Sequence, residues 1–151
     1  MAEALDMAGE LDVDEIARTL MVGISLASRR MRQLRLNDEV TPPEISALAR
    51  LDRGGPTTSS ALAKQEQISP QSMGATLAGL EARGLVARHP DPDDGRRVIL
   101  SLTDAGRNVL RNRRTAKVET LAKALSGGFS ETELARLKVA APLIERLAQR
   151  I

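Results

Sequence analysis

Some residue types are absent or almost absent from this chain of 151 residues. It contains no cysteine, a single histidine (His89) and a single aromatic residue (Phe129). The lack of cysteine excludes disulfides, thiol sensors, thiolate metal sites and cysteine nucleophiles. One histidine cannot build a histidine-rich metal site, and we interpret His89 as a strand-end residue without a special role. Proteins that bind RNA or single-stranded DNA usually stack bases on aromatic side chains, so duplex DNA remains as the nucleic acid that this composition allows.

Long apolar runs are also missing. No stretch approaches the roughly 20 apolar residues that a membrane helix needs, and residues 1–14 lack the basic start and apolar core of a signal peptide. We therefore expect a cytoplasmic protein that does not enter a membrane. Hydrophobic residues make up 42% and charged residues 28%, which is typical of a globular protein, and the length predicts a single domain over residues 1–151.

The formal net charge is only +2, so the distribution of charge says more than its sum. Basic residues gather in two places, at Arg29, Arg30, Arg32 and Arg35 and again at Arg107, Arg111, Arg113, Arg114 and Lys117. Such clusters can face phosphates. The more ordinary interpretation of any single cluster is a solvated face of a helix, and the sequence leaves both interpretations open.

Apolar spacing predicts a mainly helical chain. Residues 13–35 carry an apolar stripe with steps of three and four, which marks one face of a helix. Further helices are predicted over residues 42–52, 57–66, 70–83, 104–125 and 131–151, and most of them begin at a Ser or Thr cap. Gly127 and Gly128 are expected to end the fifth helix, and Pro142 to kink the last one.

The period changes to two between residues 85 and 102, which predicts a β-hairpin. Val98, Leu100 and Leu102 alternate with more polar neighbours, as in a strand with one buried face. Residues 90–96 are rich in turn formers and form the expected tip. Two helices, a tight turn, a third helix and a hairpin follow one another within residues 42–102, and this order is that of a winged helix-turn-helix with its wing at residues 85–102.

In such a motif the helix after the turn enters the major groove with its first residues. Its first turn here offers Ser69, Gln71 and Ser72, which are short polar groups able to contact phosphates or base edges. Of these, only Gln71 can form a bidentate pair with a base, and adenine is its natural partner. One turn further on, Ala75 can touch a thymine methyl group and Thr76 offers a hydroxyl group.

The hairpin tip supplies the long basic side chains. Arg96 and Arg97 can reach a neighbouring minor groove, and Asp94 stands two residues before Arg96, where it could hold that guanidinium in place. Acidic and basic residues balance between residues 69 and 102, so Lys64 and the flanking arginines would supply much of the attraction to phosphates.

Three segments resemble the multiple antibiotic resistance regulator (MarR) family. They are residues 84–88 (GLVAR), 91–97 (DPDDGRR) and 100–106 (LSLTDAG). The resemblance covers nearly the whole chain and implies a homodimeric transcription regulator, usually a repressor, that binds a pseudo-palindromic operator. It implies that residues 13–35 and 104–151 form the dimer, that residues 42–102 bind DNA, and that Arg96 enters the minor groove.

Family members are commonly released from DNA by small amphipathic anions or by thiol oxidation, and the second route is closed to a chain without cysteine. The resemblance therefore suggests an aromatic or anionic effector between the dimer helices and the DNA-binding lobe. Its pocket would be lined by Met21, Ile24, Arg29, Leu48 and Arg111, although these can also be ordinary core and surface residues. The apolar stripes exceed what one small lobe can cover, and they predict a dimer seam that includes Ile16, Leu20, Leu137, Ile144 and Ile151.

One departure from the family concerns the helix that would read DNA. Gly74 and Gly79 lie inside it, and each costs roughly 1 kcal/mol relative to alanine. Either they allow a close approach to the DNA backbone, or this helix reads bases poorly.

Two other function classes remain as alternatives. A winged helix can be a protein-interaction module with weak DNA binding. An enzyme would need a nucleophile with its base, a phosphate-binding loop or a metal cluster, and the sequence contains none of them. Asp91, Asp93 and Asp94 do not follow the calcium-loop pattern. We therefore expect no catalysis, no cofactor and no metal.

Overall fold

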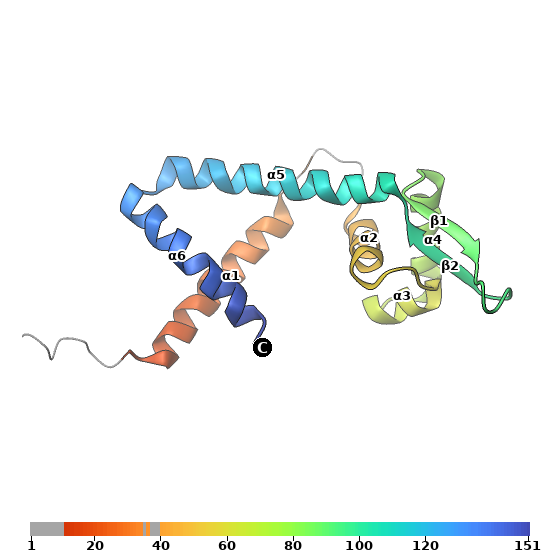
Figure 1. Ribbon diagram of the computed structural model, residues 1–151, viewed down its shortest axis with the longest axis horizontal. Helices are drawn as coiled ribbons and strands as arrows, with labels where there is room; N and C mark the ends of the chain where they lie inside the picture. Colours follow the sequence, from red (N-terminus) through yellow and green to blue (C-terminus); the bar gives the residue numbers. More distant parts are fainter. Residues whose placement is uncertain (1–10, 35, 37–39) are drawn as a thin grey trace, which may run out of the picture. The chain divides into compact units, whose positions relative to one another are not determined.

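The computed structural model describes residues 11–34, 36 and 40–151 (Figure 1). The chain divides into two units, Met1–Arg35 and Leu36–Ile151. The first unit contains helix α1 (Val13–Gln33). It begins at Asp12, whose carboxylate accepts hydrogen bonds from the backbone N–H groups of Asp14 and Glu15. The predicted helix is confirmed, but it ends at Gln33, and Arg35 lies outside the described residues.

The second unit holds the remaining described elements. These are α2 (Pro42–Gly54), α3 (Ser59–Glu66), α4 (Pro70–Ala82), β1 (Val86–Pro90), β2 (Val98–Leu102), α5 (Asp104–Gly128) and α6 (Glu131–Ala148). The two strands pair antiparallel, with Val86 opposite Leu102 and Pro90 opposite Val98. The described residues therefore confirm a mainly helical fold with one small hairpin. None of the described helices is long and apolar enough to cross a membrane.

Caps start most of these helices where the sequence indicates. Thr41, Thr58, Ser69, Thr103 and Ser130 each accept a hydrogen bond from a backbone N–H in the following first turn. Such caps satisfy donors that the helix itself leaves unpaired, and each contributes about 1 kcal/mol. The chain leaves α2 and α4 through Gly55 and Gly84, whose φ angles are +76° and +69°. Both are left-handed conformations that glycine adopts at little cost.

One hydrophobic core joins α2, α3, α4 and the hairpin into a lobe, which we call the winged lobe (residues 40–110). Its largest fully buried side chains are Leu48, Leu62, Met73, Leu77, Leu80 and Leu100. Fully burying a side chain of this size is worth about 1.5–3 kcal/mol. The lobe thus has a core of its own, and this core fixes the inner faces of α3 and α4.

A close junction ties the start of α5 to the wing. The Thr103 hydroxyl donates to the carbonyl oxygen of Gly84 at 2.7 Å and accepts from the N–H of Gly106 at 3.1 Å. A Cβ atom on Gly106 would lie 2.3 Å from the carbonyl oxygen of Leu85. Only glycine allows this approach, which explains the glycine in the LSLTDAG segment.

Three sequence predictions need correction. Thr57 does not begin α3, because its backbone pairs with Leu100 of β2 at N···O distances of 3.0 and 2.8 Å. Gly127 and Gly128 do not break α5, which runs through Gly128 and ends where Phe129 becomes extended. The glycine penalty of about 1 kcal/mol per residue is too small to stop a helix at its last turn. The last helix ends at Ala148 rather than at residue 151, and Pro142 lies within it.

Candidate nucleic-acid interface

The first two turns of α4 present a polar outer face. The Ser69 hydroxyl accepts from the backbone N–H of Ser72 at 3.1 Å and donates to the Ser72 hydroxyl at 2.9 Å. The Thr76 hydroxyl donates to the backbone carbonyl oxygen of Ser72 at 3.0 Å. The hydroxyl groups of Ser69 and Thr76 therefore donate their hydrogen bonds within the helix. The Ser72 hydroxyl can still donate a hydrogen bond to an acceptor on a partner molecule.

Gln71 and Ala75 are exposed on the same helix. Within the described part of the chain the Gln71 amide makes no hydrogen bond, so its donor and acceptor are both available to a partner. Met73, Leu77 and Leu80 are buried on the other side of α4 and hold it against the core. A helix fixed by its inner face presents its outer side chains in one orientation, as base recognition requires.

The wing tip is organised by Asp91. Its carboxylate accepts from the backbone N–H of Asp93 at 2.9 Å, and its Oδ2 lies 3.9 Å from Nε of Arg97. The Asp91 side chain is only 14% exposed. Sequence reasoning assigned the supporting role to Asp94 and missed Asp91, although an aspartate two residues before a loop N–H is a known turn signal.

Asp94 does support the tip, but through the backbone. Its Oδ1 accepts from the backbone N–H of Arg96 at 3.1 Å, and Asp94 forms no hydrogen bond or ion pair with the Arg96 guanidinium in the described structure. The predicted clamp on the guanidinium is therefore wrong. The Arg96 side chain is exposed and forms no hydrogen bond or ion pair in the described structure, so all of its donors remain available.

A shallow hollow of about 390 Å³ lies where α3, α4 and β2 meet. It is lined by Thr58, Ser59, Ser60, Pro70, Arg97 and Val98. Sequence reasoning missed the hydroxyl groups at the start of α3, because it treated this segment only as a helix start. The hollow brings these hydroxyl groups, the first residue of α4 and the guanidinium of Arg97 together, a combination that suits a phosphate group.

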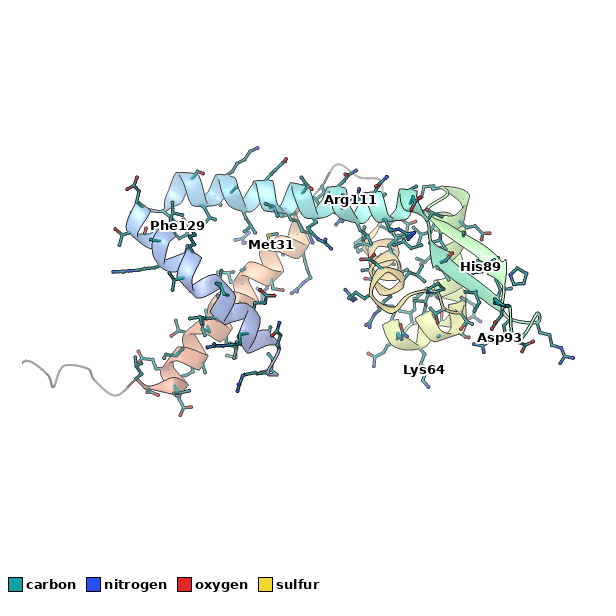
Figure 2. All side chains as sticks on the ribbon, viewed as in Figure 1. Met31, Lys64, His89, Asp93, Arg111 and Phe129 are labelled. Carbon is teal, nitrogen blue, oxygen red and sulfur yellow. The ribbon has the colours of Figure 1, made fainter. Side chains whose placement is uncertain are left out.

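Lys64 lies elsewhere on α3. Figure 2 shows its side chain projecting from the helix into solvent, and Asp93 near the tip of the hairpin. Lys64 is exposed and has no ion-pair partner in the described residues. Lys64 does not line the hollow, and its predicted contribution to the attraction of phosphates stays a prediction.

The two glycines of α4 have different surroundings. No atom lies within 4 Å of a Cβ built on Gly74, whereas a Cβ on Gly79 would lie 3.2 Å from Oε1 of Glu44. Gly79 therefore faces α2 inside the lobe. A close approach to DNA does not explain this second glycine.

The predicted effector residues belong to different elements of the chain. Met21, Ile24 and Arg29 belong to α1, Leu48 is fully buried in the lobe core, and the exposed Arg111 guanidinium donates to the Asn108 side chain at 3.1 Å. A separate hollow of about 400 Å³ lies between α2 and α5. Its lining is Ile45, Ala49, Asp52, Arg53, Leu110, Arg113, Arg114 and Lys117, without any of the predicted residues.

None of the predicted seam residues is buried in the described structure. Ile16, Leu137, Ile144 and Ile151 are exposed and Leu20 is partly exposed. Neither α1 nor α6 buries a single side chain. The described residues also contain no cluster of histidine and acidic side chains able to hold a metal ion.

Comparison with known proteins decides the family. The MarR family model matches residues 40–98, which span most of the winged lobe. An HTH-type transcriptional regulator of Mycobacterium bovis is 35% identical over 117 residues, which cover 77% of this chain and 82% of that protein. This chain belongs to the MarR family. A regulator of Mycobacterium leprae is 38% identical, with 75% and 81% of the two chains covered.

Solved structures agree with this membership. A putative transcriptional regulator of Pseudomonas aeruginosa is 33% identical, with a TM-score of 0.69 over 89% of this chain and 95% of its own. A MepR variant of Staphylococcus aureus, solved bound to an oligodeoxyribonucleotide, shares the fold at 23% identity and a TM-score of 0.58, with 94% and 100% of the chains covered. This MarR protein is a DNA-binding transcription regulator and not an enzyme.

Proposed function

We propose that the protein is a homodimeric repressor that binds an inverted repeat in duplex DNA and works in the cytoplasm. In this proposal α4 enters the major groove and the wing places Arg96 in the adjacent minor groove. The observation that carries it is that two side chains able to recognise DNA have no partner among the described residues and stand on a supported backbone. Gln71 and Arg96 both lack partners among the described residues. Gln71 stands on a helix that the lobe core holds in place. Arg96 stands in a wing tip whose turn Asp91 and Asp94 support by accepting from backbone N–H groups.

Exposed apolar side chains on α1 and α6 support the proposed dimer. On α6 the exposed large apolar side chains are Leu137, Val139, Leu143, Ile144 and Leu147, and α1 carries a comparable set. Apolar surface of this extent commonly marks a protein–protein interface. Two copies related by a twofold axis would also present two α4 helices to DNA, so half-sites should lie about one helical turn apart. A particle of 16.3 kDa in light scattering at micromolar concentration would contradict the dimer.

Gln71 is the proposed base reader. Its side-chain NH2 can donate to N7 of adenine while its side-chain oxygen accepts from the N6 amino group, which makes a bidentate pair. Ser69 and Thr76, by contrast, donate their hydroxyl protons within the helix. We expect one well-specified A·T position in each half-site and softer preferences set by DNA shape elsewhere.

Selection of bound duplexes from a random pool tests this reader. Gln71→Ala should cost roughly 1–3 kcal/mol at the A·T position and leave non-specific binding nearly unchanged, because no charge is removed. Gln149→Ala, at the end of α6, is the matched control and should select the parent motif. If Gln71→Ala returns the parent half-site with equal information at every position, Gln71 is not a reader.

Arg96→Ala tests the wing. The variant should lower the dependence of binding on salt by about one unit of slope and should weaken binding most at sites with narrow A·T-rich flanks. Equal affinity of parent and variant for such sites at one salt concentration would overturn the assignment. Failure of the parent to select any motif, together with capture of a stable protein partner, would favour the interaction-module alternative.

The release of the repressor by a small anion is the last part of the proposal. The hollow between α2 and α5 supports it, because Arg53, Arg114 and Lys117 line it beside Ile45 and Leu110. Cations next to apolar side chains suit an aromatic carboxylate. Benzoate and salicylate should raise the melting temperature and weaken operator binding in the parent, and should do so less in Lys117→Ala. If neither acid changes the melting temperature or the operator affinity, release by an aromatic anion is contradicted.

A further inference from the structure

One carboxylate joins the start of α2 to the end of α4. Glu44 is the third residue of α2, and its Oε2 accepts from the backbone N–H of Thr41 at 2.9 Å. The same oxygen forms an ion pair with Nη2 of Arg83, the residue that caps the end of α4. Glu44 thus completes the capping box of its own helix and also holds a residue of the next helix but one.

The surface of α4 is shaped to receive this carboxylate. Oε1 of Glu44 would lie 3.2 Å from a Cβ on Gly79, so the missing side chain of this glycine leaves room for it. Nε of Arg83 lies 3.4 Å from the carbonyl oxygen of Gly79, which folds the guanidinium back along its own helix toward Glu44. Gly79, Arg83 and Glu44 therefore form one contact, which we call the α2–α4 clasp.

The α2–α4 clasp is sheltered and charged. The Glu44 side chain is 13% exposed and that of Arg83 is 33% exposed. Burial raises the pKa of Glu44, but the hydrogen bond from Thr41 and the hydrogen bond and charge of Arg83 outweigh it, so that the pKa lies below its ordinary value. By contrast, the pair between Arg88 and Glu81 is 43% and 40% exposed, and exposed pairs of this kind contribute little.

We propose that Glu44 is a positioning residue for DNA recognition, which fixes the end of α4 and thereby the placement of its first turns. The inference rests on the proposed function, because it concerns the same helix. A helix of 13 residues is about 20 Å long, so that a tilt of about 5° at one end moves the other by about 1.7 Å. Hydrogen bonds to base edges tolerate a range of only about 0.5 Å. Loss of the clasp should therefore reduce sequence discrimination more than overall attraction to DNA.

The test compares two variants that change the net charge equally. Glu44→Gln keeps an acceptor for the Thr41 N–H and loses the ion pair with Arg83, whereas Glu81→Gln removes one acid from α4 itself and leaves the clasp intact. The measured quantity is the ratio of affinities for the selected duplex and for a scrambled duplex at one salt concentration. We expect this ratio to fall about tenfold in Glu44→Gln and to stay within about twofold of the parent in Glu81→Gln.

Arg83→Gln approaches the clasp from its other side and leaves the capping box of α2 in place. It should lower the ratio as Glu44→Gln does, while circular dichroism shows the parent helix content in all three variants. Equal ratios in parent, Glu44→Gln and Arg83→Gln would overturn the proposal.

A DNA-free measurement separates this inference from the proposed function. Backbone amides in the last turn of α4 should exchange with solvent at least about fivefold faster in Glu44→Gln than in Glu81→Gln. If the parent selects no motif, the proposed function fails, and the exchange rates alone decide whether Glu44 holds α4. Equal rates in the two variants would then overturn the positioning role.

Discussion

The winged lobe buries a hydrophobic core, whereas helices α1 and α6 leave their apolar side chains at least partly exposed. The lobe encloses side chains such as Leu48, Leu77 and Leu100 without help from another chain. Neither α1 nor α6 encloses any, although both carry apolar stripes at helical spacing. The same apolar periodicity in the sequence therefore corresponds to a buried core in the winged lobe and to an exposed surface on α1 and α6.

This difference predicts that the stability of the lobe core and the stability gained by association can be measured separately. A closed core stabilises the lobe whatever the protein concentration is. An apolar stripe that is left exposed contributes stability only when another surface covers it, and if that surface belongs to a second chain the contribution must grow with protein concentration.

The largest effect should come from the lobe core. Leu77 is completely buried, and Leu77→Ala should cost about 2–5 kcal/mol of unfolding free energy because it leaves a cavity. Ile144→Ala, on the open face of α6, should lower stability only through the dimer. Urea unfolding at two protein concentrations distinguishes them. A loss in Ile144→Ala that is the same at both concentrations would contradict the distinction.

The junction between wing and α5 should come next. Gly106→Ala places a Cβ 2.3 Å from the carbonyl oxygen of Leu85, and the resulting shift of the backbone should cost about 3 kcal/mol. Gly95→Ala is the matched control, since no atom lies within 4 Å of its Cβ position. Thermal unfolding of both variants measures the difference. Equal melting temperatures would show that the backbone between the wing and α5 accommodates the methyl group without loss of stability.

A smaller effect should separate the two glycines of α4. Gly74→Ala meets no neighbour and should stabilise the lobe by about 0.5–1 kcal/mol, the usual helix gain. Gly79→Ala should gain less or lose stability, because its methyl group would press on Glu44. Denaturant midpoints of the two variants should therefore differ in this order. The reverse order would show that the α2–α4 clasp leaves spare room.

The smallest effect should be the acid sensitivity of Glu44. The pKa of Glu44 in the folded protein lies below the ordinary value of 4.5. Its ionised carboxylate therefore contributes its full stabilisation of the fold above pH 4.5 and loses it as the pH falls through the folded pKa. Glu44→Gln should therefore be less stable than the parent at neutral pH, and the gap should narrow in acid. Unfolding free energies at neutral pH and below 4.5 provide the check. A gap that stays constant would show that Glu44 has no depressed pKa.

Much of the fold could be predicted because its signals are local. The caps at Thr41, Ser69 and Ser130 and the left-handed glycine at residue 84 each act within a few residues of the chain. The period-two alternation before Leu102 marked β2 for the same reason. The outward polar residues of α4 followed from its apolar stripe, since residues between buried positions must face away from the core.

The remaining features join residues that are distant in the sequence. The pairing of Thr57 with Leu100, the approach of Gly79 to Glu44 and the approach of Gly106 to Leu85 each bring two elements together. A local pattern shows that a glycine is present, but not which atom comes near it. Even inside the wing, the choice between Asp91 and Asp94 depended on the exact path of the tip.

The order of the elements and the buried face of each helix in the winged lobe therefore follow from the sequence alone, because capping and periodicity act over one or two helical turns. Only the tertiary structure decided which guanidinium groups are held and which are free. Arg83 and Arg97 have carboxylate partners within the lobe, whereas Arg96 has none among the described residues. The physical reason is that an ion pair depends on separations of a few ångströms, and these arise only after the elements have packed.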